Sequence, residues 1–246
     1  MERVWWVVVA AGKSKRMGPV GPKMWLSVDG RSLMERVLSA VSLTGLADGG
    51  ALVVQAHDVD RSEKVVKSMF ETGRFVVTRG ADTRAASVRR GLEALVSLGA
   101  GDRDMVLIHD GARPLVSPEL STRVVQAVSR HGAAVPLLPV VDTVKEVDVE
   151  QRRLLGTMDR GRLGLAQTPQ GFRFGLIREA HEMIAPDESV TDDAEVMERL
   201  EYPVFYVAGD PVNRKITTAE DLSWLRWYLS QAAAMKGEDD ENWSGI

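Results

Sequence analysis

The sequence predicts a single-domain α/β protein with a Rossmann-like, doubly wound and mostly parallel sheet. Six short apolar runs alternate along the chain with amphipathic segments of helical period, which is typical of this fold class. The first run, at residues 5–10, is apolar without interruption and is followed closely by Gly12. Such a run indicates a strand that is buried on both faces, as in a parallel sheet.

The expected strands and helices follow from these runs in chain order. We expect strands at residues 5–10, 51–54, 75–77, 105–108, 133–138 and 203–207. We expect helices at residues 33–43, 61–70, 83–95, 118–130, 173–183 and 219–229. Because no internal repeat or linker divides the chain, residues 1–235 are expected to form one domain.

Two segments depart from the alternation of strand and helix. Residues 139–158 alternate in polarity like a β-hairpin but are too hydrophilic for a core element. A hairpin that leaves the body of a domain often pairs with another subunit, so we expect a protruding dimerisation arm; a solvated surface hairpin is the open alternative. The acidic stretch 236–246 is expected to be a disordered tail.

Composition excludes several classes of protein and site. The chain has 246 residues and a formal net charge of −4, which gives no general attraction to nucleic acid or to an anionic membrane. Without cysteine, neither disulfides nor thiolate metal sites can form. The N-terminal apolar run is too short for a signal peptide or a membrane span, so we expect a cytoplasmic protein without nucleic-acid or membrane partners.

The loop after the first strand is the first candidate site. It combines small residues, Ala10-Ala11-Gly12, with four cations, Lys13, Lys15, Arg16 and Lys23. Small residues let backbone N–H groups approach phosphate oxygens, and ligands of open α/β sheets bind beside the carboxyl ends of strands. The loop therefore predicts a polyphosphate site, with a basic surface turn as the alternative.

This loop matches neither of two familiar phosphate motifs. A P-loop would need a glycine at position 7, which is Val7, and Ser14 replaces the second glycine of the dinucleotide fingerprint. The four histidines show no spacing typical of a metal site, and no Gly-x-Ser-x-Gly elbow indicates a serine hydrolase.

Three other segments supply polar residues at the ends of expected elements. Arg84 and Ser87, three residues apart, share a helical face near the ligand edge of the sheet. Asp110 follows an apolar strand, where a carboxylate can hold Mg²⁺ against phosphates, although an ordinary turn aspartate would look the same. Arg214 and Lys215 place two adjacent cations before the last helix.

The ordered set of motifs resembles the 2-C-methyl-D-erythritol 4-phosphate cytidylyltransferases, whose fold is that of the nucleotide-diphospho-sugar transferases. The resemblance covers roughly residues 4–229. It rests on Ala10-Ala11-Gly12-x-x-x-Arg16-Met17 with Pro22-Lys23, Arg84-x-x-Ser87-Val88, His109-Asp110-x-Ala112-Arg113-Pro114, Asp142-Thr143-x-Lys145, Asp159-Arg160, Gln167-Thr168-Pro169-Gln170, Thr191-Asp192-Asp193 and Lys215-Ile216-Thr217.

The resemblance implies a homodimeric enzyme that joins CTP and 2-C-methyl-D-erythritol 4-phosphate into 4-diphosphocytidyl-2-C-methyl-D-erythritol and pyrophosphate, for isoprenoid precursors by the non-mevalonate pathway. It implies that the phosphates are contacted by Arg16, Lys23 and Lys215, and that Asp110 carries Mg²⁺ as cofactor. CTP would be bound by Ala10, Ala11, Gly12, Gly80, Asp82, Arg84 and Ser87. The polyol phosphate would be bound by Arg113, Thr168 and, across the dimer, Thr143 and Arg160.

Three positions depart from the family pattern. Ser14 and Ala81 stand where glycines are common, and Val212 stands where relatives often have an acidic residue beside the metal, which makes Asp210 the candidate for a second carboxylate ligand. The same CTP loop would also suit a cytidylyltransferase for another polyol phosphate such as ribitol 5-phosphate. A catalytically silent nucleotide-binding protein is a further alternative, and a hexose-1-phosphate uridylyl- or guanylyltransferase fits the motifs less well.

Overall fold

A mixed sheet forms the centre of the protein in the computed structural model, which describes residues 2–12, 22–185 and 188–241. The strand order is β10-β7-β11-β6-β1-β4-β5, and β12 pairs with β7. The bounds are β1 (Val4–Val9), β4 (Gly49–Val54), β5 (Phe75–Arg79), β6 (Met105–Asp110), β7 (Ala133–Pro139), β10 (Gly164–Ala166), β11 (Gln170–Arg173) and β12 (Phe205–Ala208). β1 pairs in parallel with β4 and β6, whereas β11 runs antiparallel to both β6 and β7. The expectation of a mostly parallel α/β sheet is therefore confirmed.

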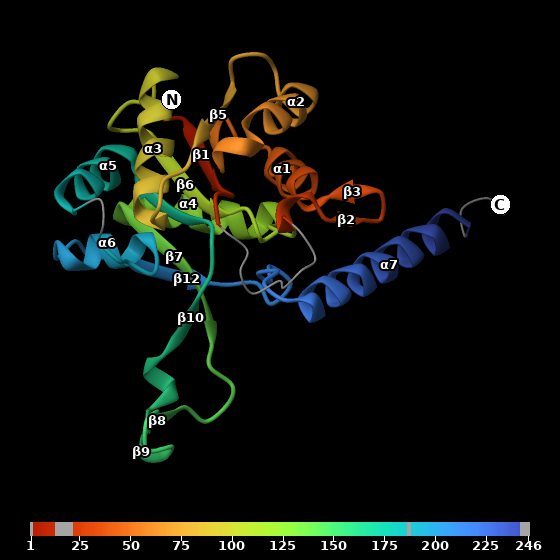
Figure 1. The fold of residues 1–246 in the computed structure, drawn as a ribbon. Helices are drawn as coiled ribbons and strands as arrows, with labels where there is room; N and C mark the ends of the chain where they lie inside the picture. Colours follow the sequence, from red (N-terminus) through yellow and green to blue (C-terminus); the bar gives the residue numbers. More distant parts are fainter. Residues whose placement is uncertain (1, 13–21, 186–187, 242–246) are drawn as a thin grey trace.

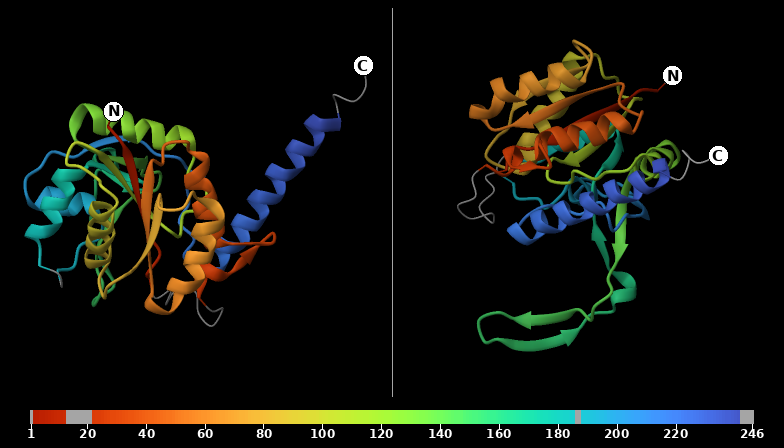
Figure 2. Two further views of the ribbon diagram at one scale, coloured as in Figure 1. Left: turned by 90° about the horizontal axis from the view of Figure 1, so that it is seen from above. Right: turned by 90° about the vertical axis from the view of Figure 1, so that its right-hand side faces the viewer.

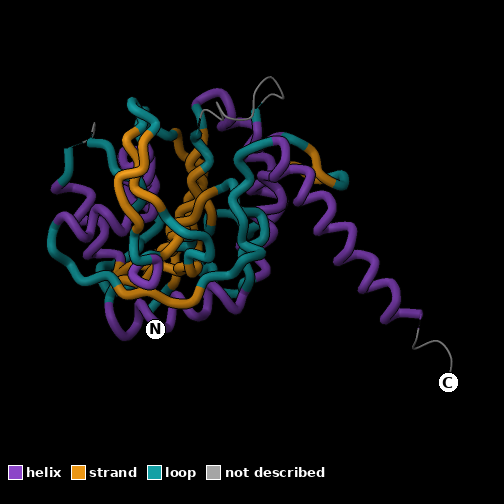
Figure 3. Tube along the Cα trace, turned by 90° about the horizontal axis from the view of Figure 1, so that it is seen from below, coloured by secondary structure: helices purple, strands orange, loops and turns teal. Residues whose placement is uncertain are grey.

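Helices cover both faces of the sheet because successive side chains of a strand point to opposite sides. Trp6 and Val8 of β1 belong to one core cluster, with side chains of α1 (Leu33–Leu43), α2 (Val59–Met69), α4 (Pro118–His131) and α7 (Ala219–Glu241). Trp5 and Val7 belong to the other cluster, with side chains of α3 (Arg84–Ser97), α5 (Phe174–Met183) and α6 (Asp193–Arg199). Figures 2 and 3 show the strands enclosed by helices, as expected for a doubly wound domain.

Several short elements are additional to those expected from the sequence. They are β10, β11, α6, the small hairpin β2 (Ser27–Val28) and β3 (Arg31–Ser32), and the 3-10 turns η2 (Lys23–Trp25), η3 (Ala56–Asp58) and η4 (Arg160–Arg162). Each is too short to show a hydrophobic period of its own. In β11, moreover, a Cβ added at Gly171 would lie 2.6 Å from the Val124 side chain. Val124 of α4 thus packs where a side chain of this strand would otherwise stand.

The segment expected to form a hairpin does so and leaves the body of the domain (Figure 1). β8 (Lys145–Asp148) pairs antiparallel with β9 (Arg153–Thr157), and the chain returns through η4 and β10. Contrary to the hydrophilic character expected, the segment exposes large apolar side chains, including Val149 at 81% and Leu154 at 65%. We call residues 140–163 the arm; its role in dimerisation stays a prediction.

Helix α7 projects from the body of the domain in Figures 1 and 2. It begins at Ala219 as expected and extends past residue 229 to Glu241, while the expectation of a disordered tail over 236–246 stays a prediction. The stretch 231–236, Gln-Ala-Ala-Ala-Met-Lys, consists of strong helix formers, which favours continuation of the helix past residue 229. Within the described ranges, the structure contains no helix with both the length and the apolar character needed to span a bilayer.

Candidate active site

A cavity of about 500 Å³ opens at the carboxyl ends of β1 and β6, beside the first turn of α3. Nine of the residues expected in the site line it: Ala10, Ala11, Gly12, Lys23, Asp82, Arg84, Ser87, Asp110 and Lys215. Met24, Ala112 and Thr217 also contribute to its wall. Four segments distant in sequence thus meet at one edge of the sheet, where the sequence predicted a phosphate site.

The other expected site residues lie elsewhere. Gly80, Arg113 and Thr168 are absent from the cavity wall but adjoin residues that form it. Thr143 and Arg160 are exposed on the arm and take no part in this cavity, and Arg160 donates a hydrogen bond to the carbonyl of Val141. Arg16 and Ser14 fall outside the described residues.

Asp110 is the electrostatic centre of the cavity. Its carboxylate lies 2.9 Å from Lys215 Nζ, 3.5 Å from Arg113 Nε and 3.9 Å from Arg84 Nε. Burial alone would raise the pKa of Asp110, but the three cations, led by Lys215, outweigh it and hold this pKa well below its ordinary value. Asp110 is therefore a permanent anion that organises cations around the cavity.

Behind Asp110, a buried hydrogen-bond chain fixes the end of β6. The Asp110 backbone N–H donates to Thr168 Oγ1, and Thr168 Oγ1 lies 3.0 Å from His109 Nδ1. His109 Nε2 lies 3.0 Å from the carbonyl of Arg113, which can only accept, so the proton is on Nε2 and Nδ1 accepts from the threonine hydroxyl. Burial lowers the pKa of His109 to about 4, so its ring stays neutral and the chain keeps this direction at neutral pH. Thr168, expected to bind substrate, thus already positions Asp110.

The loop that carries Lys215 is docked on the same framework. Asn213 is fully buried; its side-chain amide donates to the carbonyl of Thr168, and its own carbonyl accepts from Arg113 Nη1. Lys23 Nζ donates to the carbonyl of Ile216 at 3.0 Å, which ties η2 to the same loop. The loop that carries Lys215 is therefore anchored by Asn213, and the same loop accepts a hydrogen bond from the Lys23 ammonium group.

The turn before α3 is shaped by Gly80 and Ser87. A Cβ at Gly80 would lie 2.3 Å from Ala11 Cβ, so only glycine lets this turn approach the N-terminal loop. The Ser87 hydroxyl accepts from the N–H of Ala81 and donates to the carbonyl of Thr83 at 2.9 Å. Thr83 caps α3 by accepting from the N–H of Ala86. Gly80 and Ser87, expected to read the nucleotide, therefore act first as supports of the turn.

Asp210 does not reach the cavity. Its carboxylate accepts from the N–H of Val212 at 2.9 Å and from Ser117 Oγ at 3.4 Å, so it closes its own loop beside α4. In this arrangement Asp210 is not part of the cavity wall, and its role as a second metal ligand stays a prediction. Over the described part of the chain, no group of three acidic or histidine side chains could hold a metal ion by itself.

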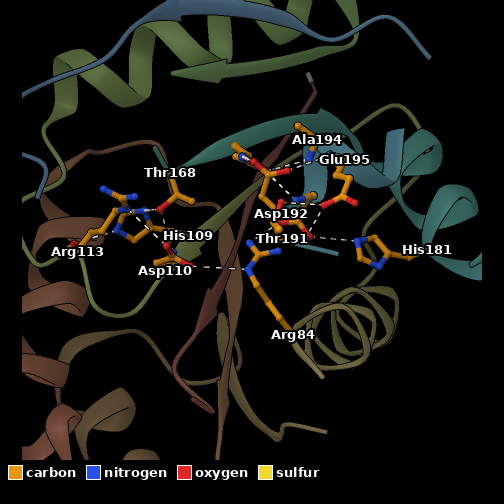
Figure 4. Close-up of polar contacts among 12 residues, drawn as sticks. Arg84, His109, Asp110, Arg113, Thr168, His181, Thr191, Asp192, Ala194 and Glu195 are labelled. Carbon is orange, nitrogen blue, oxygen red and sulfur yellow. Dashed lines mark hydrogen bonds and ion pairs between the residues drawn. The ribbon is translucent and has the colours of Figure 1, made fainter. Parts of the chain in front are cut away.

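Sequence reasoning did not assign roles to several buried polar residues that complete the site. Figure 4 shows Arg84 between Asp110 on one side and the polar residues at the start of α6 on the other. Arg84 Nη2 lies 2.6 Å from Asp193 Oδ2, and His181 Nε2 lies 3.2 Å from Asp193 Oδ1. Gln170 accepts from the N–H groups of Asp193 and Ala194 and so anchors α6 to β11. The motifs Gln167-Thr168-Pro169-Gln170 and Thr191-Asp192-Asp193 were the sequence signals for the part of this group around α6, whereas no motif indicated His181.

Comparison with known proteins places this geometry in a family. The family model described as IspD, 2-C-methyl-D-erythritol 4-phosphate cytidylyltransferase, matches residues 4–231. A protein of this name from Geobacter metallireducens is 39% identical over 228 residues, which are 92% of this chain and 97% of the relative. A bifunctional enzyme IspD/IspF from Bradyrhizobium sp. is 40% identical over 217 residues, and the chain spans only 53% of its length.

Solved structures give the same result. The 2-C-methyl-D-erythritol 4-phosphate cytidylyltransferase of Thermus thermophilus matches with a TM-score of 0.70 and 35% identity over 91% of this chain and 98% of that one. The 4-diphosphocytidyl-2C-methyl-D-erythritol synthase of Anaerococcus prevotii matches with a TM-score of 0.79 and 30% identity over 93% and 96%. The chain belongs to the 2-C-methyl-D-erythritol 4-phosphate cytidylyltransferase family.

Proposed function

We propose that this protein transfers the cytidylyl group of CTP to 2-C-methyl-D-erythritol 4-phosphate and releases pyrophosphate. The observation that carries the proposal is the ion pair of Asp110 and Lys215 in a cavity lined by Ala10, Ala11 and Gly12. Small residues at a strand end let backbone N–H groups approach phosphate oxygens, and the cations at the cavity attract phosphate charge. Membership of the family supplies the identity of the two substrates.

The reaction needs positioning and charge stabilisation more than proton transfer. A phosphate oxygen of the polyol phosphate forms a bond to the α-phosphorus of CTP, while the bond from that phosphorus to the oxygen leading to the β-phosphate breaks. The electron pair leaves with pyrophosphate. Because a phosphate monoester is largely ionised near neutral pH, no strong general base is required. Lys23 and Lys215 would stabilise the charge that develops on the phosphates.

The residues at the cavity fit a magnesium ion held jointly with substrate. Mg²⁺ at phosphate sites is usually bound by one or two carboxylates together with phosphate oxygens and waters. Asp110 offers one ionised carboxylate at the cavity wall. With the ion bound, this carboxylate would interact with Mg²⁺ as well as with Lys215 and Arg84. We therefore propose Asp110 as the protein ligand; a bound Mg²⁺ would neutralise part of the phosphate charge.

We further propose that the active protein is a homodimer whose arm completes the partner's site. Thr143 and Arg160 are exposed and lie on the arm, away from the cavity of their own subunit. The exposed apolar side chains of the arm are suited to burial against a second copy. Arg113 and Thr168 would contact the polyol phosphate from the subunit that binds CTP. A cytoplasmic location stays a prediction.

Pyrophosphate release measured with each of the four nucleoside triphosphates tests the proposal. Each nucleotide is combined with 2-C-methyl-D-erythritol 4-phosphate and, separately, with ribitol 5-phosphate. We expect activity with CTP and the methylerythritol substrate. Activity with ribitol 5-phosphate alone would support the alternative polyol, and binding of CTP without release from either would indicate a silent nucleotide-binding protein.

A further inference from the structure

Arg84 reaches the cavity from the first turn of α3 and is shared between two carboxylates. Nη2 pairs with Asp193 at 2.6 Å, whereas Nε lies 3.9 Å from Asp110, so the stronger contact faces away from the cavity centre. Nη1 is buried and has no hydrogen-bond partner among the described residues. A buried donor without a partner costs free energy unless a ligand satisfies it. Arg84 therefore lines the cavity with a guanidinium that still has one donor without a partner among the described residues.

Asp193 is fixed by two different donors. Its side chain is fully buried at 0% exposure, and it begins helix α6. Oδ2 accepts from Arg84, and Oδ1 lies 3.2 Å from His181 Nε2. Because an ionised carboxylate can only accept, the proton of His181 is on Nε2. Each oxygen thus has its own partner, and the carboxylate cannot turn without losing one of them.

His181 lies one contact further from the cavity. Its side chain is 1% exposed in α5, and it does not line the nucleotide cavity. Its Nδ1 has no partner in the described part of the chain, so the bond to Asp193 is the polar contact that this buried ring makes. An imidazole buried for a single hydrogen bond is costly as packing alone.

We propose that His181 and Asp193 are positioning residues that hold Arg84 for the nucleotide. Asp193 draws the guanidinium back from Asp110, and His181 keeps Asp193 in the orientation that does so. Without this pair, Arg84 would be free to close on Asp110 and withdraw its donor from the cavity. This inference rests on the proposed function, because it takes the ligand to be the polar part of CTP.

Calorimetric titration with CTP on paired variants of His181 tests the inference. In His181→Gln the side-chain amide can occupy the place of Nε2, whereas in His181→Asn it reaches only the place of Nδ1 and cannot bond Asp193. We expect His181→Asn to weaken CTP binding about three- to tenfold and His181→Gln to stay within about twofold of the unaltered protein. Asp193→Asn should weaken binding at least as much as His181→Asn.

A double-mutant cycle separates positioning from general damage to the fold. Arg84→Met should weaken CTP binding about tenfold or more, and adding His181→Asn to it should weaken binding no further, because the effect acts through Arg84. As a matched control, Ile177→Ala on the same helix should lower the melting temperature and leave CTP affinity unchanged.

Multiplicative losses in the double variant, or equal losses for His181→Gln and His181→Asn, would overturn the positioning role. If His181→Asn does not fold, the same cycle with Asp193→Asn decides the question. Failure of the unaltered protein to bind CTP would overturn the proposed function as well. Normal turnover of the unaltered protein, together with multiplicative losses of CTP affinity in the double variant, would overturn the inference alone.

Discussion

Replacement of Lys215 by methionine separates charge from shape at the centre of the cavity. The change removes the ammonium group, which lies 2.9 Å from Asp110, and keeps an aliphatic stem of similar length. Three cations attract the Asp110 carboxylate: Lys215, Arg113 at 3.5 Å and Arg84 at 3.9 Å. If each attraction scales with inverse distance, Lys215 supplies about two-fifths of the total. The variant therefore loses the main counter-charge of Asp110 and, with it, the proposed phosphate contact.

We expect Lys215→Met to lower kcat at least about a hundredfold, on the scale of about 2.7–4 kcal/mol for one preorganised charge at a transition state. The assay is release of pyrophosphate from CTP at saturating polyol phosphate. The matched control is Arg214→Met: Arg214 is the adjacent cation, 48% exposed, and pairs with Asp221 at 2.7 Å outside the cavity. It should stay within about threefold of the unaltered rate, because Arg214 does not line the cavity.

Two results would refute this reasoning. Lys215→Met could fold normally and turn over within about threefold of the unaltered protein, which would remove its role at the phosphates. Alternatively, Arg214→Met could lose as much activity as Lys215→Met. The general positive charge of the loop, rather than the position of one ammonium group, would then be responsible.

Three further predictions use other parts of the structure. Gly80→Ala should lower the free energy of unfolding by about 1–3 kcal/mol, since the added Cβ would lie 2.3 Å from the Cβ of Ala11. At Gly12 an added Cβ would have no atom within 4 Å, so Gly12→Ala should keep the free energy of unfolding and weaken only CTP binding in calorimetry. Burial raises the pKa of Asp104, but its hydrogen bonds and the charge of Arg3 outweigh burial and lower this pKa. The stabilising effect of the Asp104 carboxylate should therefore be complete above about pH 4 and disappear as the pH falls through the lower folded-state pKa. Urea unfolding of Asp104→Asn should show a weaker dependence of stability on acid pH, and an unchanged dependence would contradict this role. Arg160→Glu on the arm should raise KM for the polyol phosphate and leave CTP affinity intact; loss of CTP binding would argue against a site completed by the partner's arm.

The elements with a strong local signal were predicted closely from sequence. Helix α1 was expected at residues 33–43 and occupies Leu33–Leu43. Its start is sharp because Ser32 and Glu35 form a capping box, which satisfies two backbone donors at the N-terminus. The first strand shifted by one residue, to Val4–Val9, within the ordinary uncertainty of element ends. Both elements therefore carry a signal that can be read from the local sequence.

The cavity wall was predictable for a different reason. Ala10, Ala11 and Asp110 follow or end parallel strands, and the carboxyl ends of such strands meet at one edge of a sheet. The rule gives the edge, but it does not say which side chains turn toward each other. Asp210 illustrates the limit, because it follows a strand of the same sheet and is nevertheless used by its own loop.

The parts that could not be predicted depend on contacts between distant segments. Arg84 and Asp193 are 109 residues apart, and His109 and Thr168 are 59 apart. Read locally, Asp192 is an N-cap of α6, and it does accept from the N–H of Glu195. Nothing in the local pattern indicates that Asp193, the next residue, turns inward to an arginine on another helix. Such pairings follow from the sheet order, which the sequence did not provide.

The antiparallel strand β11 explains how Asp110, at the end of β6, and the start of α6 are kept together. It lies between the parallel strands β6 and β7, and the residues at its start bond in both directions. Thr168 Oγ1 accepts from the backbone N–H of Asp110, while Gln170 accepts from the N–H of Asp193 and donates to the carboxylate of Asp192. A shift of this short segment would therefore move Asp110 and the start of α6 together. Because Arg84 lies between the two carboxylates, the inserted strand fixes the geometry that Arg84 must span.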